Sequence, residues 1–186
     1  MVSQPTQPDL TPEAYLALET ESDIKHEYMD GQAYAMAGTT DQHNTISLNI
    51  ASLLRNHLRG SGCRTHMADV KIRLVSLNCF YYPDLFVTCD PRDLETPLYK
   101  CFPKLIIEVL SDSTEAFDRG DKFNHYQTLS TLEEYILINT RQQRIEAFRR
   151  AQNGLWVLQT YSTDTERQDT LNPNLNSPNL SFKVSV

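Results

Sequence analysis

Residues 104–126 read KLIIEVLSDSTEAFDRGDKFNHY, and this stretch decides the predicted fold. Its first seven residues form a nearly continuous apolar run, which is typical of a strand covered on both faces of a sheet. Residues 111–114 then open a helix that we expect to run to about Leu129, with Asp112 and Glu115 at the spacing of a capping box. The chain therefore passes directly from a buried strand into a helix.

Charged residues interrupt this apolar pattern. Glu108 lies inside the strand, and Lys122 lies on the helix, whose return across the sheet brings the lysine alongside Glu108. A second apolar stretch, FYYPDLFV at residues 80–87, contains Asp84. Burial of a carboxylate is unfavourable unless another group compensates it. Two such carboxylates and a lysine indicate a site that holds a divalent metal against a phosphodiester.

The predicted chemistry follows from the residue types. Carboxylate oxygens are hard ligands that suit Mg²⁺, with Mn²⁺ as a substitute. We expect Asp84, Glu108 and the backbone carbonyl of Val109 to hold the metal, which lowers the pKa of a bound water. Lys122 would orient or activate that water, or stabilise developing negative charge. The alternative is structural: an ion pair between Glu108 and Lys122, with Asp84 capping a bulge at Pro83.

Outward from this region, the pattern predicts further helices and strands. After a loose lead-in over residues 1–10, Thr11 and Pro12 begin a short helix, and Asp30-Gly31 marks a hairpin turn. A helix capped by Asp41 runs to about Arg59, and its apolar face consists of Ile46, Ile50, Leu53 and Leu54.

Strand patterns fill most of the remaining chain. Residues 64–75 and 80–89 each predict one strand, and Pro83 places the second at a sheet edge or a bulge. Residues 90–103 form an excursion. Three further strands are predicted at residues 134–139, 144–150 and 155–161. A long loop follows at residues 163–180, and a last strand closes the chain at residues 180–186.

Composition limits the function classes. The 186 residues predict one domain over residues 1–186, and 17 Lys and Arg against 24 Asp and Glu give a net charge of −7. This acidity is the main observation against a nuclease, because proteins that coat nucleic acid are basic. The four cysteines, at positions 63, 79, 89 and 101, predict reduced thiols. Without a signal peptide or a long apolar run, we expect a cytoplasmic protein and no membrane contact.

The motifs, in their order, resemble the PD-(D/E)XK nuclease superfamily, and more closely its Uma-two branch of restriction endonucleases. The resemblance covers roughly residues 11–186, and these segments carry it: HEYMDG (26–31), the helix with His43, YYPD (81–84), IIEVLSDST (106–114), DRGDKFNHY (118–126) and EYILIN (134–139). It implies an α/β fold of the restriction-endonuclease-like type, a mixed sheet flanked by helices with an N-terminal hairpin. It also implies a metal site at Asp84 and Glu108.

The resemblance extends to single residues. The strand lysine of the superfamily is absent here, and Lys122 matches the position to which this branch has moved it. Glu27 matches a glutamate on the first hairpin, where it would bind a second metal or orient the metal ligands; the alternative is an exposed strand residue. His43 could support the metal site or bind phosphate; the alternative is a hydrogen-bonded histidine at a helix start.

The sequence thus predicts a Mg²⁺-dependent endonuclease that hydrolyses DNA, with Asp84, Glu108, Lys122 and Glu27 as catalytic residues. Because cutting both strands of a duplex takes two sites, we expect a homodimer. The alternative is a nuclease-derived module that binds nucleic acid or a protein without cutting. The arginines of residues 141–150 could contact a phosphate backbone, or could belong to a solvated hairpin.

Overall fold

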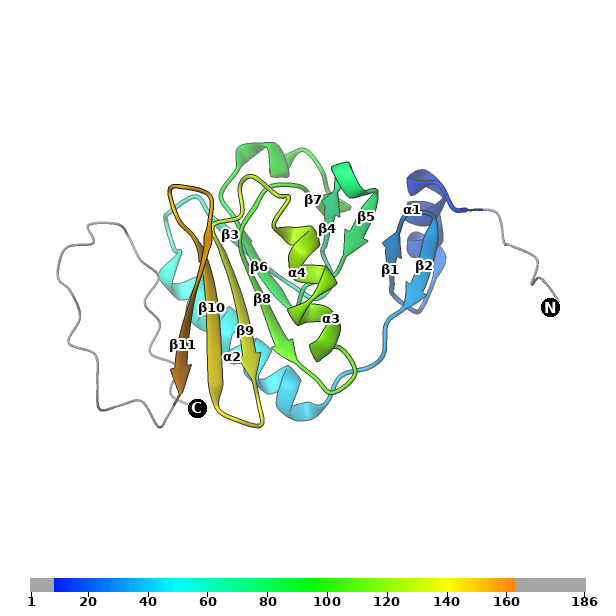
Figure 1. Cartoon of the computed structure of the whole chain (residues 1–186). Helices are drawn as coiled ribbons and strands as arrows, with labels where there is room; N and C mark the ends of the chain where they lie inside the picture. The colour runs from blue at the N-terminus through cyan, green and yellow to red at the C-terminus, as the bar shows by residue number, and fades with distance from the viewer. Residues whose placement is uncertain (1–8, 163–186) are drawn as a thin grey trace.

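The computed structural model describes residues 9–162, which form two mixed sheets and four α-helices within that range (Figure 1). A five-stranded sheet has the order β2-β1-β5-β4-β7, and a six-stranded sheet has the order β11-β10-β9-β8-β6-β3. The elements are α1 (Pro12–Glu21), β1 (His26–Met29), β2 (Gln32–Ala35), α2 (Asp41–His57), β3 (Arg64–Met67), β4 (Lys71–Leu74), η1 (Val75–Leu77), β5 (Cys79–Tyr81), β6 (Leu85–Thr88), η2 (Pro91–Leu94), β7 (Tyr99–Lys100), β8 (Pro103–Leu110), α3 (Glu115–Arg119), α4 (Asp121–Tyr126), β9 (Glu134–Asn139), β10 (Arg144–Arg150) and β11 (Trp156–Ser162).

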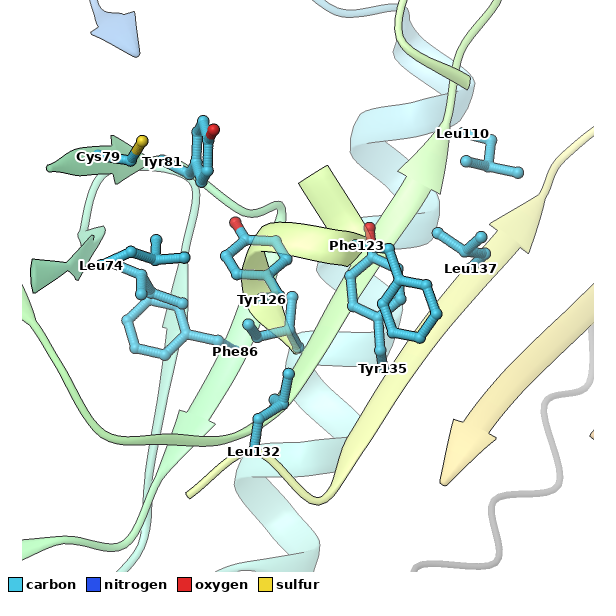
Figure 2. Packing of buried hydrophobic residues seen from close by; sticks show 12 residues of the cluster. Leu74, Cys79, Tyr81, Phe86, Leu110, Phe123, Tyr126, Leu132, Tyr135 and Leu137 are labelled. Atoms are coloured by element: carbon cyan, nitrogen blue, oxygen red, sulfur yellow. The ribbon is translucent and has the colours of Figure 1, made fainter. Parts of the chain in front are cut away.

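Strand β8 is central to the six-stranded sheet. It pairs antiparallel with β6 and parallel with β9, and seven of its eight residues are buried. Helix α2 packs on one face of this sheet through Ile50 and Leu54, and α4 packs on the other through Phe123 and Tyr126 (Figures 1 and 2). The expected doubly covered strand is therefore confirmed. Because side chains alternate along a strand, Glu108 lies on the α4 face with its neighbours Ile106 and Leu110.

The two central strand predictions were each too long. Residues 64–75 form β3 and β4, and residues 80–89 form β5 and β6, so each expected strand is split between the two sheets. Pro83 lies between β5 and β6, in neither strand, and neither of these strands is an edge strand. A proline cannot donate to a strand ladder, which explains why the chain leaves one sheet there and enters the other.

Helix α2 begins and packs slightly differently from the prediction. Its N-cap is Thr40, not Asp41, because the Thr40 side chain accepts a hydrogen bond from the backbone N–H of His43. Leu53 is 44% exposed, whereas Ser47 is buried and donates its hydroxyl hydrogen to the His43 carbonyl. The buried stripe is narrower than the apolar pattern, and it admits a serine whose hydroxyl is satisfied within the helix.

The expected single helix after β8 is two short helices. Gly120 interrupts it with φ −108° and ψ −105°, and a Cβ atom there would lie 3.0 Å from the Ala116 carbonyl oxygen. The capping box does not form, since Asp112 instead pairs with Arg141 and α3 has no side-chain cap. The break reorients α4 relative to α3 at the point where the candidate site residues lie.

A disulfide corrects the expectation of reduced thiols. Cys63 and Cys89 are bonded, with their Cα atoms 4.1 Å apart, while Cys79 and Cys101 are free. Cys63 directly precedes β3 and Cys89 directly follows β6, and these two strands are antiparallel neighbours. The pairing of the strands thus brings together two cysteines that are 26 residues apart in sequence.

Other predictions are confirmed. Helix α1 has Thr11 as its N-cap and Pro12 in its first turn, and β1 and β2 form the hairpin around Asp30-Gly31. Strands β9, β10 and β11 follow in antiparallel order. The predicted loop over 163–180 and the predicted last strand over 180–186 lie outside the described residues. Within residues 9–162, no helix is long and apolar enough to cross a membrane.

Candidate active site

Lys122 lies at the centre of a buried cluster of carboxylates. Its Nζ atom is 3.0 Å from Glu108 Oε1, 3.2 Å from Glu27 Oε1 and 3.5 Å from Asp118 Oδ1. The lysine is only 5% exposed, and Glu108 and Asp118 are exposed by 2% and 3%. These residues come from β8, β1, α3 and α4, so the cluster depends on the packing of both sheets and both short helices.

The carboxylates control the charge of Lys122. Burial lowers the pKa of this lysine, but Glu108, Glu27 and Asp118 together outweigh burial and hold the pKa well above its usual value. The side chain is therefore an ammonium at neutral pH. A protonated amine donates hydrogen bonds and stabilises negative charge, but it cannot accept a proton from water.

Two of the carboxylates have pKa values that are shifted toward the protonated form. Burial raises the pKa of Glu108 well above its usual value, although the charge of Lys122 opposes the shift. Burial also raises the pKa of Asp118, again against Lys122. One ammonium thus faces three carboxylates, which leaves a surplus of negative charge in a dry environment. Such a surplus favours either protons or a cation.

Backbone hydrogen bonds lock Asp84 and Glu108 to one another. The N–H of Asp84 donates to Glu108 Oε2 at 3.0 Å, and the N–H of Val109 donates to Asp84 Oδ2 at 2.8 Å. The pairing of β6 with β8 sets this arrangement, because Leu85 lies opposite Ile107. The Asp84 side chain is 24% exposed, so the cluster opens to solvent on the Asp84 side.

His43, in the first turn of α2, contacts the same place. Its Nε2 atom is 3.1 Å from Asp84 Oδ2. The hydrogen bond to Asp84 raises the pKa of His43, and a hydrogen bond to the Val109 backbone adds to this effect, while burial opposes it. His43 is thus a direct partner of the predicted metal ligand Asp84, which agrees better with support of the site than with a histidine that only satisfies the helix start.

Glu27 reaches the cluster from the five-stranded sheet. Its Oε1 atom accepts a hydrogen bond from the N–H of Tyr82 at 3.1 Å and also faces Lys122. Its side chain is only 13% exposed, so the alternative of an exposed strand residue is wrong. The segment from Tyr82 to Asp84 joins the two sheets, and the cluster lies where the chain crosses between them.

The same crossing is anchored by a second buried network. Tyr82 donates its hydroxyl hydrogen to Glu19 Oε2 at 2.6 Å and accepts a hydrogen bond from Lys71 Nζ at 2.7 Å. Glu19 Oε1 also accepts the backbone N–H of His26 at 3.0 Å. Helix α1 and the hairpin are therefore tied to the segment that presents Asp84.

The donor atoms of the cluster suit a metal ion that keeps several of its waters better than one that is held entirely by protein ligands. Within the part of the chain that the structure describes, no three His, Cys, Asp or Glu side chains converge as metal ligands. Mg²⁺ does not need such a cage, because it usually binds one or two carboxylates and keeps several waters. Among the described residues, the buried Glu108 Oε1 atom has no partner in hydrogen-bonding geometry and has only the Lys122 ammonium as an ionic partner. The residue types Asp84, Glu108 and the Val109 carbonyl fit a water-rich Mg²⁺ site.

Sequence reasoning missed Asp118. It lies four residues before Lys122, and this spacing on DRGDK was the available signal. The expected continuous helix would place the two residues on one face, and they do meet although Gly120 breaks the helix. Tyr135 supports this position by donating its hydroxyl hydrogen to the Asp118 carbonyl at 2.9 Å.

The arginines of the β9–β10 and β10–β11 region are engaged within the protein. Arg141 pairs with Asp112, Arg144 with Glu146, and Arg149 with Glu134. Arg150 donates to the carbonyls of Gln127 and Leu129. These contacts favour the solvated hairpin over a surface reserved for phosphates.

Comparison with known proteins assigns the chain to a family. The family model Uma2, described as "Putative restriction endonuclease", matches residues 12–185. The chain belongs to the Uma2 family. The resemblance drawn from the motifs is thereby confirmed.

Individual relatives cover most of the chain. The uncharacterized protein slr1290 of Synechocystis sp. (strain ATCC 27184 / PCC 6803 / Kazusa) is 40% identical over 179 residues, or 96% of this chain and 91% of that protein. The uncharacterized protein sll1609 of the same organism is 29% identical over 151 residues, or 80% of this chain and 85% of that protein.

A solved structure shares the fold. It is the crystal structure of a putative nuclease belonging to DUF820 from Anabaena variabilis ATCC 29413, with a TM-score of 0.66 and 16% sequence identity. The match covers 82% of this chain and 84% of that chain. The predicted α/β fold of the restriction-endonuclease-like type is confirmed, with the difference that its strands form two mixed sheets.

Proposed function

We propose that this Uma2 protein is a Mg²⁺-dependent endonuclease that hydrolyses DNA phosphodiesters. The convergence of Asp84, Glu108 and Lys122 at the junction of the two sheets carries the proposal. Membership of a family described as "Putative restriction endonuclease" and a fold shared with a protein described as a putative nuclease support the reaction class. The location of the carboxylates beside an obligate ammonium supports the chemistry.

Each residue has a role that its position supports. Asp84, Glu108 and the Val109 carbonyl would hold Mg²⁺, which supplies a Lewis acid and a water of lowered pKa. Lys122 donates hydrogen bonds and stabilises the charge that develops on the phosphoryl group, and it is not the general base. Glu27 holds Lys122 in place, as does Asp118.

His43 and the Asp84 carboxylate form the exposed side of the site. A scissile phosphate would approach over Asp84, because this side chain is the most accessible of the carboxylates. His43 holds the same Asp84 Oδ2 atom that accepts the Val109 N–H, and so restricts the rotation of the carboxylate. The imidazole is thus a positioning group in this proposal.

The test is nicking of supercoiled plasmid in Mn²⁺ or Mg²⁺ by the wild type and by Asp84→Asn. Cleavage by the wild type that the variant loses is the expected result. Binding of Mn²⁺ is measured in parallel by titration calorimetry, since Asp84→Asn removes one ligand charge. Cleavage that survives in Asp84→Asn would exclude the assigned site.

The second candidate is a nuclease-derived module that binds nucleic acid or a protein without cutting. The net charge of −7 and the absence of a lysine on β8 after Glu108 favour it. A wild type that binds Mn²⁺ but cleaves neither DNA nor RNA would support this candidate. A wild type that neither binds metal nor cleaves would also remove the predicted metal site.

A further inference from the structure

Tyr126 carries a hydroxyl that the fold does not satisfy. It lies on α4, one helical turn after Lys122, and its side chain is fully buried at 0% exposure. Its hydroxyl has no hydrogen-bond partner among the described residues. A buried hydroxyl without a partner destabilises a fold, so such a group calls for an explanation in a native protein.

The neighbouring tyrosines behave differently. Figure 2 shows Tyr126 between Tyr81 and Tyr135, and its ring centroid lies 5.7 Å from each of theirs. Tyr135 donates its hydroxyl hydrogen to the Asp118 carbonyl at 2.9 Å, and the Tyr81 hydroxyl lies 2.6 Å from Nδ1 of His125. The same aromatic cluster therefore satisfies two hydroxyls and leaves the third without a partner.

The unpartnered hydroxyl belongs to the environment of the candidate site. The Tyr81 ring that packs against Tyr126 also lies 5.8 Å from Lys122 Nζ. Burial raises the pKa of Tyr126, and the charges of Glu108 and Glu27 raise it further. The phenol therefore keeps its proton and offers an O–H donor beside the carboxylate cluster.

A buried acceptor of this region is only partly satisfied. Glu108 Oε1 has no partner in hydrogen-bonding geometry among the described residues, although Lys122 Nζ lies 3.0 Å away as its ionic partner. A buried donor without a partner and a buried acceptor with spare capacity are groups that a buried water molecule typically joins.

We propose that Tyr126 is a positioning residue, whose hydroxyl donates a hydrogen bond to a water of the cation's hydration shell beside Glu108. The proposal rests on the proposed function, because it assumes a hydrated divalent cation at Asp84 and Glu108. Mg²⁺ and Mn²⁺ keep several waters when two carboxylates hold them. Groups that bind such waters orient the metal without being ligands themselves.

The test substitutes Tyr126→Phe, which keeps the ring and its packing and removes only the hydroxyl. In the metal-free protein we expect a melting temperature close to that of the wild type, because the hydroxyl makes no hydrogen bond to any of the described residues. The dissociation constant for Mn²⁺, measured by titration calorimetry, should rise about tenfold, as expected on removal of an outer partner of a metal site.

Tyr28→Phe is the matched control. Tyr28 is also a fully buried tyrosine, but its hydroxyl donates to the Leu10 carbonyl at 2.7 Å in the cluster around α1. This variant should lower the melting temperature of the metal-free protein and leave the Mn²⁺ affinity unchanged.

Two outcomes would overturn the inference, and they are distinguishable. If the wild type binds Mn²⁺ at Asp84, as judged by loss in Asp84→Asn, and Tyr126→Phe binds it equally well, the role of Tyr126 is refuted and the proposed metal site stands. If the wild type binds no Mn²⁺, the proposed function and this inference both fail.

Discussion

Lys122 shows how one residue can combine structure with chemistry. Its ammonium lies within 3.5 Å of three carboxylates, so it is an ion-pair partner of Glu108, as the structural alternative expects. The same contacts raise its pKa and fix it as a cation at the candidate metal site. The structural and the catalytic interpretations of this residue are therefore compatible.

Replacement of Lys122 tests both roles. Lys122→Ala should abolish Mn²⁺-dependent cleavage and destabilise the fold by about 3–5 kcal/mol, because it leaves buried carboxylates without their cation. Lys122→Arg should recover part of the stability but little activity, since a planar guanidinium does not replace a compact ammonium. Plasmid nicking and thermal unfolding measure the two effects. Wild-type cleavage rates in Lys122→Ala would refute the assigned role.

The raised pKa values of Glu108 and Asp118 predict a pH dependence of stability in the metal-free protein. Between the usual carboxylate pKa and these raised values, the folded state binds more protons than the unfolded state. Stability contributed by these groups should therefore increase as pH falls through the raised pKa values toward the usual carboxylate range. The raised pKa of Lys122 adds no loss in this window, because its contribution is lost only at alkaline pH.

Glu108→Gln isolates this effect. In chelator, the variant should melt above the wild type at a pH above the raised pKa of Glu108, and the gap should narrow as pH falls. Thermal unfolding across the pH range provides the measurement. Parallel pH profiles for the two proteins would show that the pH dependence of stability does not arise from Glu108.

At the level of elements, the break between α3 and α4 positions the cluster. Asp118 lies near the end of one helix and Lys122 near the start of the next, and a Cβ atom on Gly120 between them would crowd the Ala116 carbonyl. The crossing between the two sheets supplies Asp84, and β8 supplies Glu108. The site therefore requires the junction of several elements and not the rigidity of any one of them.

Gly120→Ala tests the importance of the helix break. Its added Cβ would lie 3.0 Å from the Ala116 carbonyl oxygen, so α3 or α4 must shift. We expect a loss of about 1 kcal/mol in stability and a larger relative loss of Mn²⁺ affinity, because Asp118 and Lys122 move. Gly38→Ala is the control, since a Cβ atom added there would meet nothing within 4 Å. Unchanged metal affinity in Gly120→Ala would show that the break does not position the site.

On the scale of the whole molecule, residues 9–162 contain one candidate site, and the chain that carries it is acidic. A net charge of −7 weakens the attraction to DNA away from the site. A bound divalent cation would reduce the repulsion between the acidic protein and the DNA phosphates at the place where a phosphodiester would approach Asp84. Cutting both strands of a duplex nevertheless calls for a second site.

Metal linkage is a whole-molecule prediction. Mn²⁺ at about 100 times its dissociation constant should stabilise the fold by about 2.7 kcal/mol and raise the melting temperature accordingly. The gain arises because the cation relieves repulsion among the carboxylates. Asp84→Asn should lose most of it in the same thermal scan. An equal gain in that variant would place the metal elsewhere.

A homodimer is the second prediction at this scale. A two-fold dimer would supply two sites to one duplex. We expect sedimentation velocity to show a dimer at micromolar concentration, and Asp84→Asn to sediment identically, because the metal site and the association of subunits are separate properties. A monomer both with and without duplex DNA would contradict the prediction.

The sequence by itself determined the elements whose signals are local. The apolar run around Glu108, the Asp30-Gly31 turn and the cap at Thr11 each act over a few residues, and each was predicted correctly. Lys122 could be paired with Glu108 for the same reason, because a short strand and a returning helix connect them.

Only the tertiary structure decided what lies around that pair. Pro83 predicts an interruption of the strand ladder, but the sequence does not say that the chain enters another sheet there. The approach of Glu27, the position of Asp118 after a broken helix, and the unpartnered hydroxyl of Tyr126 all depend on packing between distant segments. Periodicity reports which face of an element is buried, whereas the contacts across that face are set by the whole fold.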